Sequence, residues 1–179
     1  MKLAETFKKE LAPALKTELG LKNLNAVPTL QKVTVSVAIS PSKHKDGKLM
    51  ETAGEVLKRI TGQQPVKTKA RISISNFKTR QGQILGWKVT LRGKRMWDFV
   101  EKLVHVTFPR VRDFRGIPKT VVDHQGNLSY GFVEHLAFPE VRSDEVEQVH
   151  GLQVTLTSSA KGREDGTALF KALGFPFQQ

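Results

Sequence analysis

Polar and apolar positions alternate in two stretches near the middle of the chain, which predicts a pair of β-strands. The first stretch, residues 66–72, alternates small or apolar side chains with Lys67, Lys69 and Arg71. The second, residues 84–92, alternates Trp87, Val89 and Leu91 with Lys88, Thr90 and Arg92. Successive side chains of a strand point to opposite faces, so each strand has one face for a core and one basic face. We expect both basic faces to lie on the same side of one sheet.

Further alternating stretches predict additional strands. Residues 33–40 place Val33, Val35, Val37 and Ile39 on one side, and Pro41 ends the run. Residues 152–158 point Leu152, Val154 and Leu156 inward. Residues 128–138 predict a further strand or hairpin, because apolar side chains alternate at their start.

Apolar positions spaced by three and four predict four helices. They cover residues 2–19, 46–60, 94–104 and 163–173. Pro13 is expected to kink the first helix, which is placed to dock on the core, and Pro109 is expected to end the third.

The order of these elements is strand, helix, strand, strand, helix, insert, strand. This order predicts an α+β fold of the split β-α-β (ferredoxin-like) type, an antiparallel sheet with helices on one face. An N-terminal helix and an inserted loop or hairpin region complete it. We expect a single domain over residues 1–179, with the N-terminal helix at 2–19 and the core at about 27–174. The uncovered face would carry Thr34, Ser36, Lys67, Lys69, Arg71, Lys88, Thr90, Arg92, Gln153, Thr155 and Thr157.

The charge balance narrows the class of partner. The chain has 29 Lys and Arg against 17 Asp and Glu, a net charge of +12 and a pI near 10.1. Such a surface attracts polyanions, so a nucleic acid is the first interpretation and an anionic membrane surface the alternative. The chain lacks cysteine, a signal-peptide core and an apolar run near the ~18 residues of a membrane helix, so we expect a cytoplasmic protein.

The chemistry of the polar face favours folded RNA. Hydroxyl groups suit phosphate and ribose, cations suit phosphate, and arginine can also fork onto a base edge. Aromatic residues are missing from the predicted face, so it does not resemble a platform that stacks unpaired bases. An ordinary solvated face is the alternative, although such a face has no reason to be biased to one charge.

Two other basic segments stand out. The loop 73–86 is longer than a hairpin turn, and it is either a floppy excursion or an arm that reaches a second nucleic acid. The segment 110–116 surrounds Phe114 with arginines, which could bind phosphate, a carboxylate partner or the ring. Alternatively, Asp113 pairs with a neighbouring arginine and Phe114 fills a small core. We expect Asp113 to form this pair, while the outer arginines stay available.

Enzymatic function is not favoured. The five histidines show no metal-ligand spacing, and the glycines at 86 and 93 do not have the spacing of a phosphate-binding loop. We therefore expect no enzyme, no cofactor and no metal. An RNA-modifying or phosphate-transferring enzyme is the remaining rival, because sequence alone does not exclude catalytic carboxylates.

Several motifs in one order resemble a known family over nearly the whole chain. They are the runs 67–71 (KTKAR), 77–82 (FKTRQG), 86–93 (GWKVTLRG), 95–97 (RMW), 109–116 (PRVRDFRG) and 174–177 (GFPF). The chain is similar to large-subunit ribosomal protein five of the bacterial type, the family that binds 5S ribosomal RNA (5S rRNA).

The resemblance implies a structural protein of the central protuberance, with 23S rRNA and neighbouring large-subunit proteins as further partners. Its sheet face would hold 5S rRNA through Ser36, Gln63, Lys67, Lys69, Arg71, Lys88, Thr90, Arg92 and Thr155. Its long loop would approach the peptidyl-site transfer RNA (tRNA) through Lys78, Thr79, Arg80 and Gln81. Its exposed arginines Arg110, Arg112 and Arg115 would meet a small-subunit head protein.

One strand departs from the family pattern. An asparagine and two glycines are usual after the first core strand, and the matching positions here are Ser36, Ala38 and Ser40. Serine reaches less far than asparagine, and a side chain in place of glycine restricts the backbone. The RNA contact from this strand is therefore the least secure part of the resemblance.

Overall fold

The computed structural model describes residues 3–39, 47–141 and 148–178. They contain a five-stranded antiparallel sheet in the order β2-β3-β1-β5-β4, with helices packed on one face. Its strands are β1 (Leu30–Ala38), β2 (Val66–Lys69), β3 (Ile84–Leu91), β4 (Leu128–Phe132) and β5 (Leu152–Ser158). Because β3 lies between β1 and β2, the prediction of a split β-α-β fold is confirmed.

The helices agree with the predicted apolar spacing. They are α1 (Leu3–Thr6), α2 (Ala12–Glu18), α3 (Gly47–Thr61), α4 (Gly93–Lys102) and α5 (Arg163–Ala172). The apolar stripe of α3 is at most 5% exposed, and Val33, Val35 and Val37 of β1 are at most 2% exposed. The predicted boundary residues Lys2, Ser40 and Asp46 lie outside the described residues.

The chain forms two compact units that interleave along the sequence. Unit 1 comprises Met1–Val33, Leu91–Tyr130 and Thr155–Gln179, and unit 2 comprises Thr34–Thr90 and Gly131–Val154. Each unit therefore depends on segments far apart in the chain. The expectation of a single domain over residues 1–179 remains a prediction.

In unit 1, both prolines expected to shape helices follow a widened turn. The π-helical turn Phe7–Leu11 ends where Ala12 N–H donates to the carbonyl of Phe7, and Pro13 follows. A second π-helical turn extends α4 through Leu103–Thr107, and there Phe108 N–H donates to the carbonyl of Leu103 before Pro109. Proline has no N–H and its ring crowds the carbonyl four residues earlier, so the turn before it widens.

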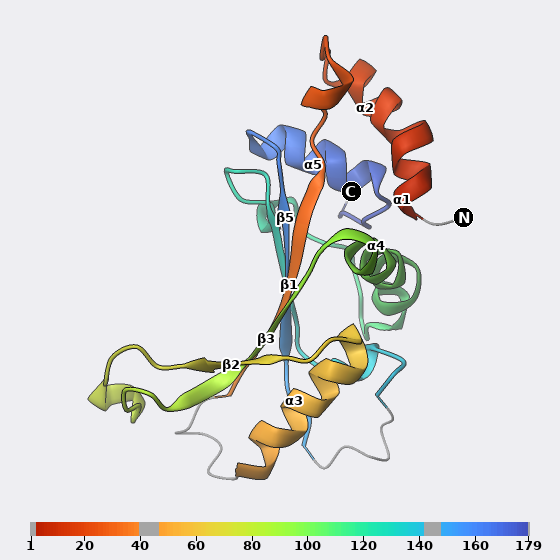
Figure 1. The fold of residues 1–179 in the computed structure, drawn as a ribbon. Helices are drawn as coiled ribbons and strands as arrows, with labels where there is room; N and C mark the ends of the chain where they lie inside the picture. The colour runs from red at the N-terminus through yellow and green to blue at the C-terminus, as the bar shows by residue number, and fades with distance from the viewer. Residues whose placement is uncertain (1–2, 40–46, 142–147, 179) are drawn as a thin grey trace. The chain divides into compact units, whose positions relative to one another are not determined.

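The first helix ends close to its predicted end, and the third runs further than predicted. The first continues through Pro13 to Glu18. The third continues past residue 104 into the 3-10 turn Phe108–Arg110, so its helical run ends one residue beyond the predicted stop at Pro109. The first helix also docks as expected. Helix α1 lies beside α4 (Figure 1). The Phe7 ring lies 5.1 Å from that of Trp97, and Leu3 N–H donates to the Glu101 carboxylate.

In unit 2, a glycine allows β3 to approach β1 closely. A Cβ at Gly86 would overlap the carbonyl oxygen of Val37. The neighbouring Ile39 N–H donates to the Leu85 carbonyl at 2.9 Å, which continues the pairing beyond β1. Any side chain at position 86 would force the two backbones apart.

Candidate nucleic-acid interface

The register of β2 on β3 determines which cations share a face. Val66 lies opposite Lys88, and Lys67 lies opposite Trp87. Directly opposed residues of an antiparallel pair point to the same side of the sheet. Val66 therefore shares a face with Lys88, and Lys67 lies on the other face. The prediction that Lys67 and Lys88 share a face was wrong.

The indole of Trp87 explains this arrangement. It packs against Gly54 of α3, where an added Cβ would lie 2.8 Å from the ring, and its Nε1 donates to the Met50 carbonyl at 2.6 Å. The Trp87 face is therefore the helix-covered face. The Lys67 ammonium lies 5.4 Å from the Trp87 ring centroid, a cation–π distance. The aromatic ring thus stabilises the positive charge of Lys67, which the alternating pattern had predicted to contact a phosphate.

The opposite side of unit 2, here called the uncovered face, consists of Ser36, Val66, Lys88 and Thr90. Lys88 is exposed, and Ser36 and Thr90 are half-buried between buried neighbours on their strands. Gln63 adjoins it, because its Nε2 donates to the Thr90 carbonyl at 3.1 Å. Hydroxyl groups next to an ammonium suit the sugar–phosphate backbone.

Val66 is an unpredicted member of this face. Its side chain is 62% exposed, although the alternation assigned it to the core. The physical reason is that Val66 lies on the face away from the helices, where an apolar side chain has no layer to pack against.

The other predicted cations of the first strand lie beyond its regular part. The register shifts between Thr68 and Lys69, so Lys69 lies opposite Ile84. Strand β2 ends there, and the exposed Arg71 belongs to the base of the following loop. A bulge of this kind turns the backbone and re-aims the side chains that follow it.

Two predicted RNA contacts belong to unit 1. Arg92 precedes α4 in extended conformation and is exposed. Thr155 of β5 is half-buried, and its hydroxyl accepts a hydrogen bond from Ser129 at 3.2 Å. Both side chains reach the surface of their own unit.

A signal that sequence reasoning missed is the length of the acid-free stretch. No Asp or Glu occurs between Glu55 and Asp98, and eleven Lys and Arg residues lie between them. Both the uncovered face and the long loop draw most of their residues from this stretch. Such a segregation of charge is typical of nucleic-acid-binding surfaces.

The long loop is an ordered hairpin arm, residues 70–83, that projects beyond β2 and β3 (Figure 1). At its base Ala70 N–H donates to the Gln83 carbonyl, and Gly82 N–H donates to the Ala70 carbonyl. Near its tip Ile74 and Thr79 exchange two backbone hydrogen bonds of 3.1 and 3.2 Å. The interpretation as a floppy excursion was therefore wrong, because the backbone bonds cross the arm at both ends.

The arm presents all of the predicted tRNA contacts at its surface. Lys78, Arg80 and Gln81 are exposed and Thr79 is half-buried. The Thr79 hydroxyl is directed back to the Ile74 carbonyl, at 3.4 Å. Thr79 thus helps to close the tip, while the two cations extend outward.

The basic segment of unit 1 exposes Arg110, Arg112 and Arg115. Phe114 between them stacks on the buried Phe108, with ring centroids 5.4 Å apart, which agrees with the alternative of a small core plug. Asp113 adopts a positive φ of 51°, and no ion pair joins it to the three arginines, all of which the structure describes. The expected Asp113–arginine pair was therefore wrong.

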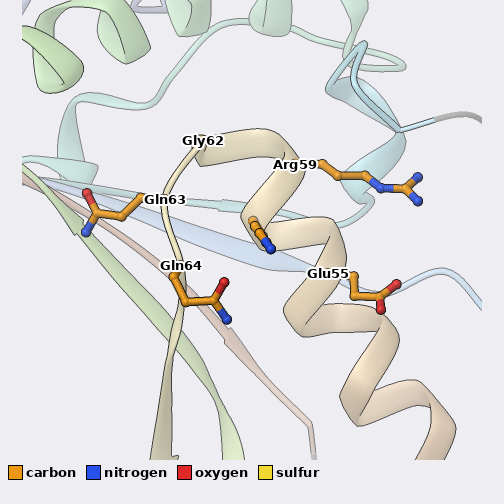
Figure 2. A pocket seen from close by; sticks show the side chains of 6 residues that line it. Glu55, Arg59, Gly62, Gln63 and Gln64 are labelled. Atoms are coloured by element: carbon orange, nitrogen blue, oxygen red, sulfur yellow. The ribbon is translucent and has the colours of Figure 1, made fainter.

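A surface pocket of about 630 Å³ lies at the C-terminal end of α3, in unit 2. It is lined by Glu55, Lys58, Arg59, Gly62, Gln63 and Gln64. Figure 2 shows Gln63 and Gln64 pointing to opposite sides of the chain, with Glu55 and Arg59 extending away on the far side of the helix. These side chains do not converge on one point, so the pocket does not resemble a catalytic site.

Among the described residues, no three His, Asp or Glu side chains are grouped closely enough to hold a metal ion. The described helices include none with both the length and the apolar character needed to cross a membrane.

Comparison with known proteins identifies two matching family models. Residues 23–80 match the model described as Ribosomal protein L5, and residues 84–177 match the model of the C-terminus of the same ribosomal family. Among curated proteins, the chain is 45% identical over 177 residues to the large ribosomal subunit protein uL5 of Francisella tularensis subsp. tularensis, covering 99% of this chain and 98% of the relative. It is 44% identical over 176 residues to the uL5 of Natranaerobius thermophilus, with 98% of each chain covered.

Proposed function

Because the chain belongs to the ribosomal protein L5 family, we propose that it binds 5S rRNA and anchors it in the central protuberance of the large subunit. The family is structural and non-enzymatic, and the chain is accordingly a structural constituent of the large ribosomal subunit, in the cytoplasm.

The observation that carries the proposal is the uncovered face of unit 2. Its hydroxyl groups at Ser36 and Thr90 adjoin the exposed ammonium of Lys88, and the acid-free stretch supplies both strands β2 and β3. Lys88 is proposed to neutralise a phosphate, while Ser36, Gln63 and Thr90 hydrogen-bond to the RNA backbone or bases. The amide of Gln63 is held by the Thr90 carbonyl, which leaves its Oε1 in a fixed position as an acceptor.

The remaining proposed 5S rRNA contacts are Lys67, Lys69, Arg71, Arg92 and Thr155. We expect Lys67 to contribute less than Lys88, because its ammonium lies over Trp87 on the helix-covered face. Arg92 and Thr155 are proposed as contacts made by unit 1. Contacts with 23S rRNA and with neighbouring central-protuberance proteins are part of the same proposal.

Two further contacts complete the proposed assembly. Lys78, Thr79, Arg80 and Gln81 of the arm are proposed to meet the peptidyl-site tRNA, since the arm is ordered, cationic and exposed. Arg110, Arg112 and Arg115 are proposed to meet a protein of the small-subunit head, and their exposure in unit 1 supports this.

A binding experiment with 5S rRNA and the full chain tests the proposal. Affinity should fall with salt, by about one unit of log–log slope for each phosphate neutralised. Duplex DNA of equal length should compete poorly, and Arg92→Glu should weaken binding far more than Lys16→Glu on the first helix. Equal competition by DNA would instead favour a general nucleic-acid-binding module, and binding to anionic vesicles of equal strength would favour a membrane-surface module.

A further inference from the structure

The tip of the arm is a closed turn that holds one aromatic ring outward. Residues Ser75–Phe77 form a single 3-10 turn, closed by Lys78 N–H donating to the Ser75 carbonyl at 2.9 Å. Lys78 adopts a left-handed conformation, with φ of 51°. Closer to the base of the arm, Gln81 N–H donates to the Ser73 hydroxyl at 2.9 Å. These bonds fix the backbone on both sides of Phe77.

The side chain of Phe77 is 64% exposed. Within the described residues no second ring and no cation packs on it, although other aromatic and histidine rings of the chain form such contacts. An exposed phenylalanine at a rigid tip gains nothing from the fold itself. Ile72 and Ile74 of the same arm are also exposed, by 66% and 37%, and such a group of exposed apolar side chains suggests an interaction outside the chain.

Charge indicates the class of partner. From Ala70 to Gln83 the arm carries Arg71, Lys78 and Arg80 and no acid. A surface of one sign next to an aromatic ring fits a polyanion that also offers a flat apolar face, which is a nucleobase on its phosphate backbone. Bases within a duplex hide these faces, so the base must be unpaired or lie at the end of a stack.

We propose that Phe77 stacks on an unpaired nucleobase of the RNA that the arm contacts, while Lys78 and Arg80 hold the flanking phosphates. The inference rests on the proposed role of the arm in RNA binding and adds the group that it recognises. It also assigns recognition of unpaired bases to the arm, whereas the uncovered face lacks an aromatic residue. Stacking needs no counter-ion release, so the ring should contribute equally at low and at high salt.

The test uses the full chain and two RNA probes. One is a hairpin RNA with a single 2-aminopurine in its unpaired loop, and the other is the same stem extended into a continuous duplex. Phe77→Ala should lower affinity for the hairpin by about 5- to 100-fold, leave the salt slope unchanged and abolish the quenching of 2-aminopurine. It should leave affinity for the duplex unchanged. Phe77→Trp should retain both affinity and quenching.

Two controls separate the ring from other effects. Ile72→Ala removes an apolar side chain of similar exposure (66%) from the same arm and should change little. Phe77→Leu keeps apolar bulk without a π face and should behave like Phe77→Ala. Full affinity of Phe77→Leu, or equal hairpin affinity of Phe77→Ala and the unaltered chain, would overturn the stacking proposal and favour a protein partner for the ring.

The double variant Lys78→Gln with Arg80→Gln distinguishes RNA binding by the arm from stacking by Phe77. If it lowers the salt slope by about one to two while Phe77→Ala has no effect, the arm binds RNA and only the stacking is wrong. If it leaves affinity and slope unchanged, the proposed role of the arm in RNA binding is wrong as well.

Discussion

The imidazole rings of His135 and His150 stack in unit 2, with centroids 4.1 Å apart and planes inclined by 22°. His135 is fully buried, and its backbone N–H donates to the His150 carbonyl at 3.1 Å. Its Nδ1 lies 2.9 Å from the same oxygen, whereas the Nε2 atoms of both rings are buried without a hydrogen-bond partner. A proton on the Nε2 of His150 would be a buried donor without an acceptor, so burial opposes the charged form of His150.

This stack predicts a loss of stability in mild acid. Burial, together with the charge of His135, lowers the pKa of His150 from 6.5 to about 4, while a hydrogen bond to Gly151 raises it slightly. Between these pH values His150 is protonated in the unfolded chain but neutral in the folded chain. The free energy of unfolding is therefore highest above pH 6.5 and decreases as the pH falls toward 4. We expect a loss of about 1–2 kcal/mol, since water partly screens the half-buried ring.

Urea unfolding followed as a function of pH checks this prediction. His150→Gln should flatten the profile between pH 6.5 and 4, whereas His105→Gln, at an exposed position, should leave it as it is. Parallel profiles for the unaltered chain and His150→Gln would show that His150 does not titrate as described.

The register of β2 and β3 predicts unequal roles for two lysines in RNA binding. Lys88→Gln should weaken 5S rRNA binding several-fold and reduce the salt slope by about one, because it removes an exposed phosphate contact. Lys67→Gln should have a smaller effect on both, because that ammonium lies over Trp87 on the helix-covered face. Each variant is the matched control of the other. A larger loss for Lys67→Gln would contradict the proposed use of the uncovered face.

The close approach of β1 and β3 predicts that Gly86 tolerates no side chain. Gly86→Ala should lower the free energy of unfolding by ~3 kcal/mol, because the added methyl group meets the Val37 carbonyl and a backbone cannot yield as a side chain can. Gly131→Ala is the control, since nothing lies within 4 Å of a Cβ there, and it should change stability by less than ~0.5 kcal/mol. Denaturant unfolding of both variants measures the difference, and equal stabilities would show that the strands can separate without cost.

In unit 1 a buried hydroxyl connects β5 to the turn before β4. Ser158 is 7% exposed; its hydroxyl donates to the Gly126 carbonyl at 2.6 Å and accepts from Ala160 N–H at 3.2 Å. Ser158→Ala should destabilise the protein by about 1–3 kcal/mol, because both partners lose a hydrogen bond in a site closed to water. Ser129→Ala, which removes an exposed hydroxyl, should lower the free energy of unfolding by less than ~1 kcal/mol. Thermal unfolding of both variants measures the difference. Equal melting temperatures for the two variants would argue against the buried connection.

Much of the fold could be predicted because a buried face produces a regular pattern of apolar residues along the chain. The stripe of α3 and the alternation of β1 and β5 gave the correct elements and inward faces, since a helix or strand with one buried face repeats apolar residues at its own period. The charge balance likewise indicated a polyanionic partner without any coordinates.

The face of an edge strand could not be predicted in this way. Alternation defines two sides of β2 but does not say which side meets the helices. The apolar Val66 predicted that its side meets them, whereas Val66 is exposed on the opposite side. Only the pairing with β3, which sets Lys67 opposite Trp87, decides it.

The sequence by itself thus determined the order of the elements and the class of fold, because these depend on local periodicity. It also indicated that the partner is negatively charged, because this depends on the total charge of the chain. Only the tertiary structure decided which cations share a surface, that Gly86 lies against Val37, and that two histidines fifteen positions apart stack. Those relationships depend on strand register and on contacts between distant segments, and neither is encoded at any single position of the chain.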